Sequence, residues 1–255
     1  MLRFNQKRYI FVLRTEKTRN SMSKKTKQKL AEQDATREAI ESAIGKTEMY
    51  IKDNGKILLA ALAAVIAVVG IFFGYKYLYA QPRENNAADM LYVAEQWFAR
   101  GEYELALNGD GNNPGFLDVI RRYGSTASGN IANHYAGICY IYLFDMSGAA
   151  QYLKAYKPVR GIPGGIINAQ NIGLQGDIFS EQGDLEKAAA KYMEAVKLSS
   201  NGLTAPYYLK KAGITYMLAG KNDAAVAAFQ AILYDYPSSV EAEDADKFIG
   251  AAQQN

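Results

Sequence analysis

The two side chains best suited to nucleophilic or acid–base chemistry are His134 and Cys139, the only histidine and the only cysteine of the chain. A cysteine nucleophile needs a base within hydrogen-bond reach. On a helix, residues with this spacing point about 140° apart around the axis, so they cannot converge. The spacing therefore excludes a catalytic pair. Because Cys139 lies in the apolar run 135–142, we expect a thiol packed in the core.

Two polar or glycine-rich segments could bind ions or phosphate. Residues 110–115 begin like an EF-hand calcium loop, but the fifth position is Pro114 and the twelfth is Arg121, where calcium needs a bidentate Glu. Residues 161–165 lack the Lys-Ser/Thr ending of a phosphate loop and are expected to be a flexible connection. No other metal-ligand spacing occurs. The sequence predicts neither an enzyme nor a metal or cofactor site.

An apolar run from Ile57 to Gly74 contains no charged residue. A helix of this length spans roughly the hydrocarbon thickness of a bilayer. The run begins too far from the N-terminus for an ordinary signal peptide, and bulky Leu78 occupies a position where a cleavage site needs a small residue. We predict an uncleaved transmembrane helix with an interfacial aromatic belt over residues 55–79.

Charge differs sharply between the two sides of this run. Residues 1–56 carry fourteen Lys or Arg and seven Asp or Glu, whereas residues 77–255 carry fourteen and nineteen. The positive-inside rule predicts a single-pass protein with its N-terminus in the cytoplasm and its C-terminal part on the far side of the membrane. The excess of Lys and Arg lies beside the predicted span, where topology and anionic lipid account for it, so we do not expect nucleic-acid binding.

The segments on either side of the span are mostly polar. Residues 1–27 are expected to form a basic, disordered arm in which Met22 is the true start, and residues 28–54 to form a cytoplasmic amphipathic helix that touches lipid or a partner. After the span, Pro82 and the polar residues around it predict a linker over 80–86.

From residue 87 onward the sequence repeats. The segment 172–195 resembles a tetratricopeptide repeat, with Gly176 at a close helix crossing, Phe179 filling the gap, Gly183 ending the first helix, and Ala188 and Tyr192 on the second. The same residue types recur thirty-seven positions later and thirty-nine positions earlier, where Phe144 replaces the turn glycine. A degenerate first unit departs from the pattern at residues 109–115 and continues with a helix over 116–123.

This resemblance implies an all-α protein: one transmembrane helix, then an α-solenoid of about four hairpins over residues 87–237, closed by a capping helix over 238–255. In such arrays the first helices of successive hairpins line a concave protein-binding groove. By the repeat offsets, the side chains expected there are Leu91, Glu95, Phe98, Asn133, His134, Ile138, Ile141, Gln170, Asp177, Ser180, Tyr207, Lys210, Ile214 and Leu218. The Lys and Asn pair that clamps chaperone carboxylate tails in one variant is replaced by Leu91 and Glu95.

A basic cytoplasmic segment, one span and an outer tetratricopeptide domain together resemble the ancillary subunits of the Sec translocon. The resemblance covers residues from about Glu38 to the end and rests on this order of parts. It implies a non-enzymatic, single-pass protein of a bacterial inner membrane, with its N-terminus in the cytoplasm and its C-terminal domain in the periplasm. The partners that it implies are translocon subunits, periplasmic chaperones or secreted chains. Two other functions remain open: a scaffold for envelope assembly or cell division, and a component of a dedicated secretion machine.

Overall fold

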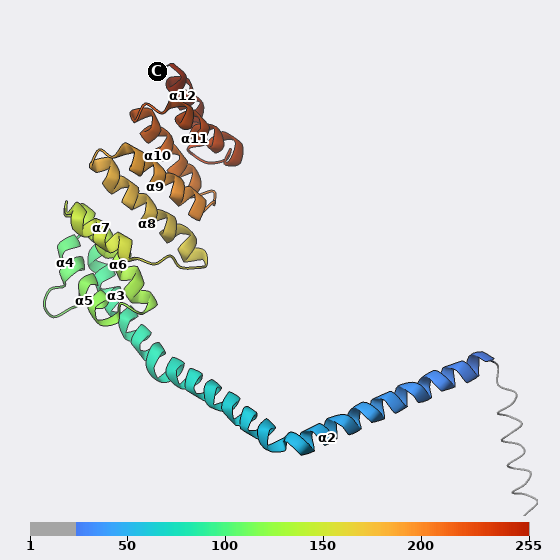
Figure 1. Ribbon diagram of the computed structural model, residues 1–255. Coiled ribbons are helices and arrows are strands. Elements are labelled where there is room, and N and C mark those ends of the chain that lie inside the picture. The colour runs from blue at the N-terminus through green and yellow to red at the C-terminus, as the bar shows by residue number, and fades with distance from the viewer. Residues whose placement is uncertain (1–23, 255) are drawn as a thin grey trace, which may run out of the picture. The chain divides into compact units, whose positions relative to one another are not determined.

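Helices make up almost all of the described part of the chain, residues 24–254, and none of those residues lies in a strand (Figure 1). In this computed structural model the elements follow one another with short connections. They are α2 (Lys24–Gly74), the π-helix η1 (Tyr75–Ala80), α3 (Gln81–Ala99), α4 (Tyr103–Asn108), α5 (Phe116–Tyr123), α6 (Ala127–Tyr142), α7 (Met146–Ala155), α8 (Ile162–Glu181), α9 (Leu185–Leu198), α10 (Ala205–Leu218), α11 (Asn222–Asp235) and α12 (Ala242–Gln254).

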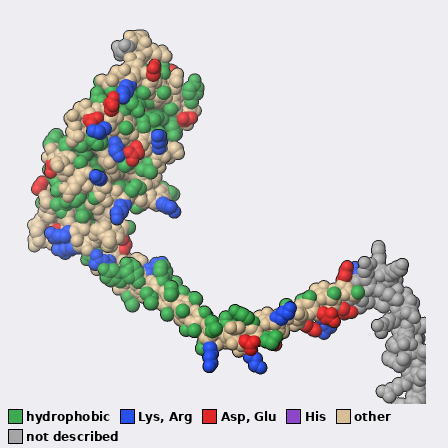
Figure 2. Space-filling model, in the orientation of Figure 1, with side chains coloured by type: hydrophobic (Ala, Val, Ile, Leu, Met, Phe, Trp, Pro, Cys, Tyr) green, Lys and Arg blue, Asp and Glu red, His purple; other side chains and the backbone are tan. Residues whose placement is uncertain are grey.

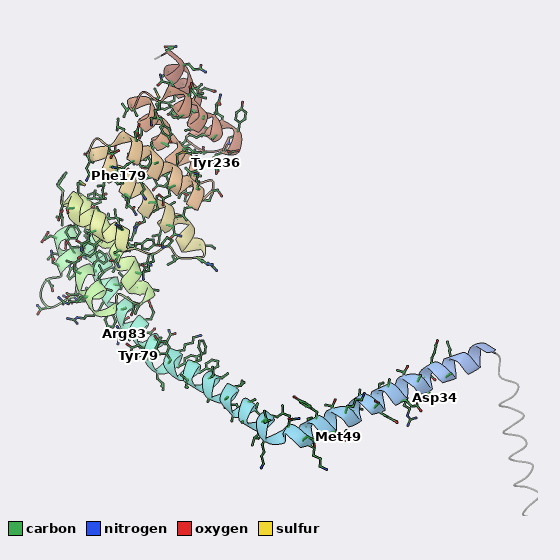
Figure 3. The ribbon with its side chains drawn as sticks, in the orientation of Figure 1. Asp34, Met49, Tyr79, Arg83, Phe179 and Tyr236 are labelled. Atoms are coloured by element: carbon green, nitrogen blue, oxygen red, sulfur yellow. The ribbon has the colours of Figure 1, made fainter. Side chains whose placement is uncertain are left out.

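The chain divides between Phe73 and Gly74 into two units. The described part of the first, the anchor unit (residues 24–73), is one helix that is long and apolar enough to cross a membrane and has no buried side chain in its apolar stretch. Figure 2 shows hydrophobic side chains covering this stretch and charges of both signs nearer its N-terminal end, and Asp34 and Met49 project from that polar half (Figure 3).

The expected arm lies outside the described residues up to position 23, including Met22, whereas residues 24–27 already belong to α2. The arm prediction is therefore wrong for these four residues. Three of the four are Lys, a good helix former, and they extend the helix that the following Leu, Ala and Glu residues maintain.

The predicted linker over residues 80–86 is also helical. Residues 81–86 form the first turns of α3, and Pro82 occupies a first-turn position, where its missing N–H costs little. The preceding turn is the π-helix η1, in which the N–H of Gln81 donates to the carbonyl of Lys76. We attribute this wide turn to Pro82, whose ring would crowd the carbonyl four residues earlier in an α-helix. Nearby, the Arg83 guanidinium lies 5.4 Å from the Tyr79 ring centre (Figure 3).

In the second unit, which we call the hairpin unit (residues 74–254), four turns share one hydrogen-bond pattern. In each turn, a residue with left-handed backbone conformation lies just after the first helix. Its N–H donates to the carbonyl three residues earlier, and the N–H of the next residue donates to the carbonyl five residues earlier. This pattern is the Schellman motif, which satisfies the last carbonyls of a helix. The four left-handed residues are Gly101, Phe144, Gly183 and Gly220, with φ of 77°, 61°, 77° and 69°.

Three hairpins also repeat one close contact between their helices. A Cβ atom added to Gly176 of α8 would lie 2.6 Å from Cε1 of Tyr192 in α9. The same position holds Gly137 against Leu153, at 2.5 Å, and Gly213 against Phe229, at 2.6 Å. Only glycine allows these helices to approach so closely, so the roles predicted for Gly176, Gly183 and Ala188 are confirmed.

The first hairpin is incomplete, as the sequence predicts. Its second helix, α4, ends at Asn108, and α5 has the bounds expected for a helix over residues 116–123. Phe116, Val119 and Leu107 pack with Trp97 and Cys139 in the largest core cluster. At the other end, α12 covers α10 and α11, where Phe248 stacks on Phe229 with ring centres 5.0 Å apart.

Candidate ligand groove

A surface groove of about 640 Å³ crosses the middle of the hairpin unit. Its lining comes from the end of α6, the turn into α7, the C-terminal half of α8, Tyr192 of α9, and residues 211–218 of α10. The apolar side chains that line it are Ile141, Tyr142, Phe144, Met146, Ile178, Ile214 and Leu218, and the polar ones are Asp177, Ser180, Glu181, Tyr192, Lys211 and Thr215. We call these thirteen residues the groove.

The most exposed apolar side chains of the groove stand at its helix ends. Phe144 is 87% exposed, Leu218 69% and Tyr142 55%. Phe144 is the only non-glycine residue with positive φ among the described residues, a conformation that costs an L-residue roughly 1–2 kcal/mol. A large apolar side chain is thus held in solvent on a strained backbone, without any packing that would offset the strain.

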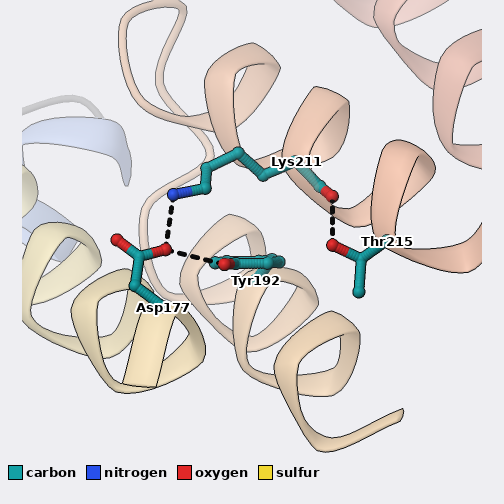
Figure 4. A network of polar contacts seen from close by, with 4 residues as sticks. All are labelled: Asp177, Tyr192, Lys211 and Thr215. Carbon is teal, nitrogen blue, oxygen red and sulfur yellow. Dashed lines mark hydrogen bonds and ion pairs between the residues drawn. The ribbon is translucent and has the colours of Figure 1, made fainter. Parts of the chain in front are cut away.

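The floor of the groove is polar (Figure 4). The carboxylate of Asp177 in α8 accepts a 2.6 Å hydrogen bond from the Tyr192 hydroxyl of α9 and forms an ion pair with Lys211 of α10. The Lys211 ammonium also lies 4.9 Å from the Tyr192 ring centre, and the Thr215 hydroxyl donates to the Lys211 carbonyl over 2.8 Å. Three helices are joined at this point. Burial, reinforced by the hydrogen bond to Asp177, raises the pKa of Tyr192 far above its usual range, so this phenol is neutral.

The polar groups in the floor of the groove satisfy one another, because Asp177 is joined to both Tyr192 and Lys211. Within residues 24–254 no three His, Cys, Asp or Glu side chains gather as they would around a metal ion. The apolar side chains around the charged pair provide contact area for another apolar surface.

Five of the expected groove residues line the groove observed, namely Ile141, Asp177, Ser180, Ile214 and Leu218. Tyr207 lies beside it, 47% exposed, with its ring centre 5.6 Å from the Lys211 ammonium. Lys210 is held elsewhere by a 2.7 Å ion pair with Asp244 of α12.

Most of the other expected groove residues lie in or against the core. Asn133 is buried, whereas Gln170 is exposed but does not line the groove. Leu91 and Ile138 are buried, and Phe98 packs edge-on against the rings of Phe116 and Tyr135. Glu95 is half-buried, and burial raises its pKa. These positions point inwards because α3 and α6 are covered by α4, α5 and α7, so less of each first helix is free than the repeat offsets imply.

His134 and Cys139 are buried separately and do not form a pair. The His134 Nδ1 atom lies 3.2 Å from the Asn171 side-chain nitrogen, and burial lowers the pKa of His134 to about 4. Burial likewise raises the pKa of Cys139 to about 12, so the expected packed thiol is confirmed.

The two segments compared above with ion- and phosphate-binding loops, residues 110–115 and 161–165, have structural roles. The Asp110 carboxylate accepts hydrogen bonds from the backbone N–H groups of Asn112, at 2.9 Å, and Asn113, at 2.6 Å, which hold its pKa below the usual value. Residues 162–165 form the first turn of α8 rather than a flexible connection. Gly164 is required there, because a Cβ atom would lie 2.1 Å from the Val159 carbonyl oxygen.

The groove residues that the sequence did not reveal are Tyr142, Phe144, Met146, Ile178, Glu181, Tyr192, Lys211 and Thr215. Phe144 carried a usable signal, because a bulky apolar residue at a turn-glycine position is costly unless its side chain serves a purpose.

Comparisons with known protein families and with curated proteins find no match to this chain.

Proposed function

We propose that this chain is a membrane-anchored, non-enzymatic protein that binds segments of other proteins in the groove. The observation that carries the proposal is the groove itself: exposed apolar side chains around a partly buried ion pair, built from three neighbouring helical hairpins. Extended apolar segments fit such a surface, because the side chains contribute contact area and the charges contribute orientation.

The repeated Schellman turns and glycine contacts support identification of the hairpin unit as a tetratricopeptide array. With the charge difference across the span, this favours a bacterial inner-membrane protein whose hairpin unit lies in the periplasm. By resemblance, its partners are translocon subunits, periplasmic chaperones or secreted chains, and it assists secreted-protein handling at the Sec translocon.

The proposal is tested by placing a photoreactive residue at Leu218 and crosslinking in intact cells. Leu218 lies in the groove and is 69% exposed, while Tyr234 of α11 is 81% exposed outside it and serves as the matched control position. We expect protein adducts from Leu218 only, containing translocon subunits, periplasmic chaperones or secreted chains. Adducts with division or outer-membrane proteins would instead favour an envelope scaffold or secretion machine. Identical adducts from both positions would contradict binding in the groove.

A further inference from the structure

The hairpin unit has two edges with opposite charge. One, the turn edge, contains the four Schellman turns at residues 100–102, 143–145, 182–184 and 219–221. The other, the loop edge, contains the connections 123–126, 156–161 and 199–204 and the first turns of α3, α6, α8 and α10. A helix of fourteen to twenty residues separates the edges by roughly 20–30 Å.

The loop edge is continuous with the end of α3 that leads to the anchor. Glu84 in the first turn of α3 accepts hydrogen bonds from the backbone of Ala127 and Ser128, at 2.7 and 3.0 Å. Farther along, Asn130 exchanges two 2.8 Å hydrogen bonds with the backbone of Lys157. The connection 156–161 then leads into α8, where the Gly165 carbonyl accepts a hydrogen bond from Ser199. The chain therefore enters the hairpin unit along this edge.

Exposed basic and aliphatic side chains alternate on the middle of the loop edge. Lys154, Lys157, Arg160 and Lys197 are exposed, and no ion pair is formed by any of them among the described residues. Beside them, Ile162 is 87% exposed, Leu203 68%, Leu198 44% and Ile166 42%. Figure 2 shows Lys and Arg side chains next to hydrophobic ones near the end of the hairpin unit where α8 begins in Figure 1.

Acidic residues are missing from this part of the edge. The sequence contains no Asp or Glu over residues 146–176 or 195–222, and Glu194, just before the second range, pairs with Lys191 at 2.8 Å. The turn edge carries Glu102, Asp145, Asp184 and Glu186, and of these Glu102, Asp184 and Glu186 form ion pairs with Arg100, Lys187 and Lys221. Asp235 and Glu241 make the last connection, between α11 and α12, acidic as well, and it lies farthest along the chain from the anchor.

We propose that residues 154–166 and 197–203 of the loop edge dock on an anionic lipid bilayer. Exposed aliphatic side chains flanked by Lys and Arg are the composition of interfacial membrane-binding segments. Each unpaired basic group of the loop edge gains attraction near an anionic surface, whereas Arg100, Lys187 and Lys221 of the turn edge are already paired with carboxylates. The anchor keeps the hairpin unit at a high effective concentration beside the bilayer, so a patch that binds weakly by itself is occupied. This inference rests on the anchor and not on what the groove binds.

The test uses the full chain in lipid nanodiscs, with a polarity-sensitive fluorophore on Ile162→Cys or on Phe144→Cys. Both positions are 87% exposed, one on the loop edge and one on the turn edge. Cys139 stays in place, since the burial that raises its pKa to about 12 keeps it unreactive. In discs containing phosphatidylglycerol, we expect quenching by spin-labelled lipid to be at least about threefold stronger for the Ile162 probe. In phosphatidylcholine discs this difference disappears.

Charge reversal supplies the second arm. Arg160→Glu with Lys197→Glu should abolish the quenching of the Ile162 probe. Arg100→Glu with Lys221→Glu, which changes the net charge equally on the turn edge, should leave it unchanged. Equal quenching at Ile162 and Phe144, or insensitivity to the first pair of substitutions, would overturn the proposal. So would a photoreactive residue placed at Ile162 that reacts with no lipid but crosslinks to an acidic protein in native membranes. A chain that fails to copurify with discs would overturn the anchor as well.

Discussion

Lys211 of α10 forms an ion pair with Asp177 of α8, a residue thirty-four positions earlier in the chain. About a quarter of the Lys211 side chain and a third of the Asp177 side chain remain exposed, and the pair lies in the floor of the groove. The contact links two successive hairpins and leaves the charges within reach of a ligand. It can therefore contribute both to the stability of the array and to the orientation of a bound segment.

Removing this pair should have a small effect on stability and a larger effect on binding. Partly exposed ion pairs contribute about 1 kcal/mol or less, so Asp177→Asn and Lys211→Met should each lower the free energy of unfolding by about 1 kcal/mol. The double variant should lose less than the sum of the two, because the pair is lost once. Urea denaturation of all four proteins measures this coupling. Strictly additive losses would mean that the pair does not form.

The close contact between Gly176 and Tyr192 predicts a large effect of added volume. Gly176→Leu should destabilise the hairpin unit by about 3 kcal/mol, since the side chain would have to separate α8 from α9. Gly250 in α12 is a matched control because a Cβ atom there meets nothing within 4 Å. Gly250→Ala should raise stability by up to about 1 kcal/mol through helix propensity. Similar thermal melting of wild type and Gly176→Leu would show that the hairpin contact is wrong.

Buried His134 predicts a loss of stability in mild acid. Its pKa is lowered to about 4 in the folded chain, chiefly by burial, whereas the unfolded value is near 6.5. The unfolded state therefore binds a proton first as pH falls, and stability declines from about pH 6.5 to about pH 4, by about 3 kcal/mol in total. The His134→Gln variant retains an acceptor for Asn171 and should lack this decline. Urea midpoints of both proteins across that range make the comparison, and parallel curves would contradict it.

The charge difference across the span predicts orientation. Protease added to spheroplasts should degrade the hairpin unit and spare the basic segment before residue 57, because Lys and Arg near a span are retained in the cytoplasm. Immunoblotting with tags at either end records the result. A hairpin unit that resists protease until the membrane is permeabilised would reverse the proposed topology.

The sequence predicted the features that depend on local rules. The apolar run, the turn glycines, Gly176 and the helix over residues 116–123 each follow from length, backbone conformation or volume at one position. The groove was harder to predict, because exposure of a first helix depends on what packs beside it. Ile138 and Leu91 share helix positions with accessible residues of other hairpins, yet neighbouring helices cover them. Lys211 could not be assigned without knowing that α10 brings it beside Asp177.

Phe144 connects the fold with the proposed function. Its backbone is strained, and its exposed side chain makes little packing contact that would offset the strain. The other three turns have glycine at this position. Phe144→Gly should therefore preserve stability or raise it by up to about 1 kcal/mol, the relief of strain being partly offset by the entropy of glycine. Removing an apolar groove side chain should at the same time weaken binding.

The central claim, that the groove binds partner proteins, is tested most directly by the yield of crosslinks from a photoreactive residue at Glu181. Glu181 is exposed and lies in the groove. The account predicts that Phe144→Gly lowers this yield at least about tenfold, with an equal or higher melting temperature, while Tyr234→Ala outside the groove leaves the yield unchanged. A yield unaffected by Phe144→Gly in a folded, membrane-inserted protein would contradict it.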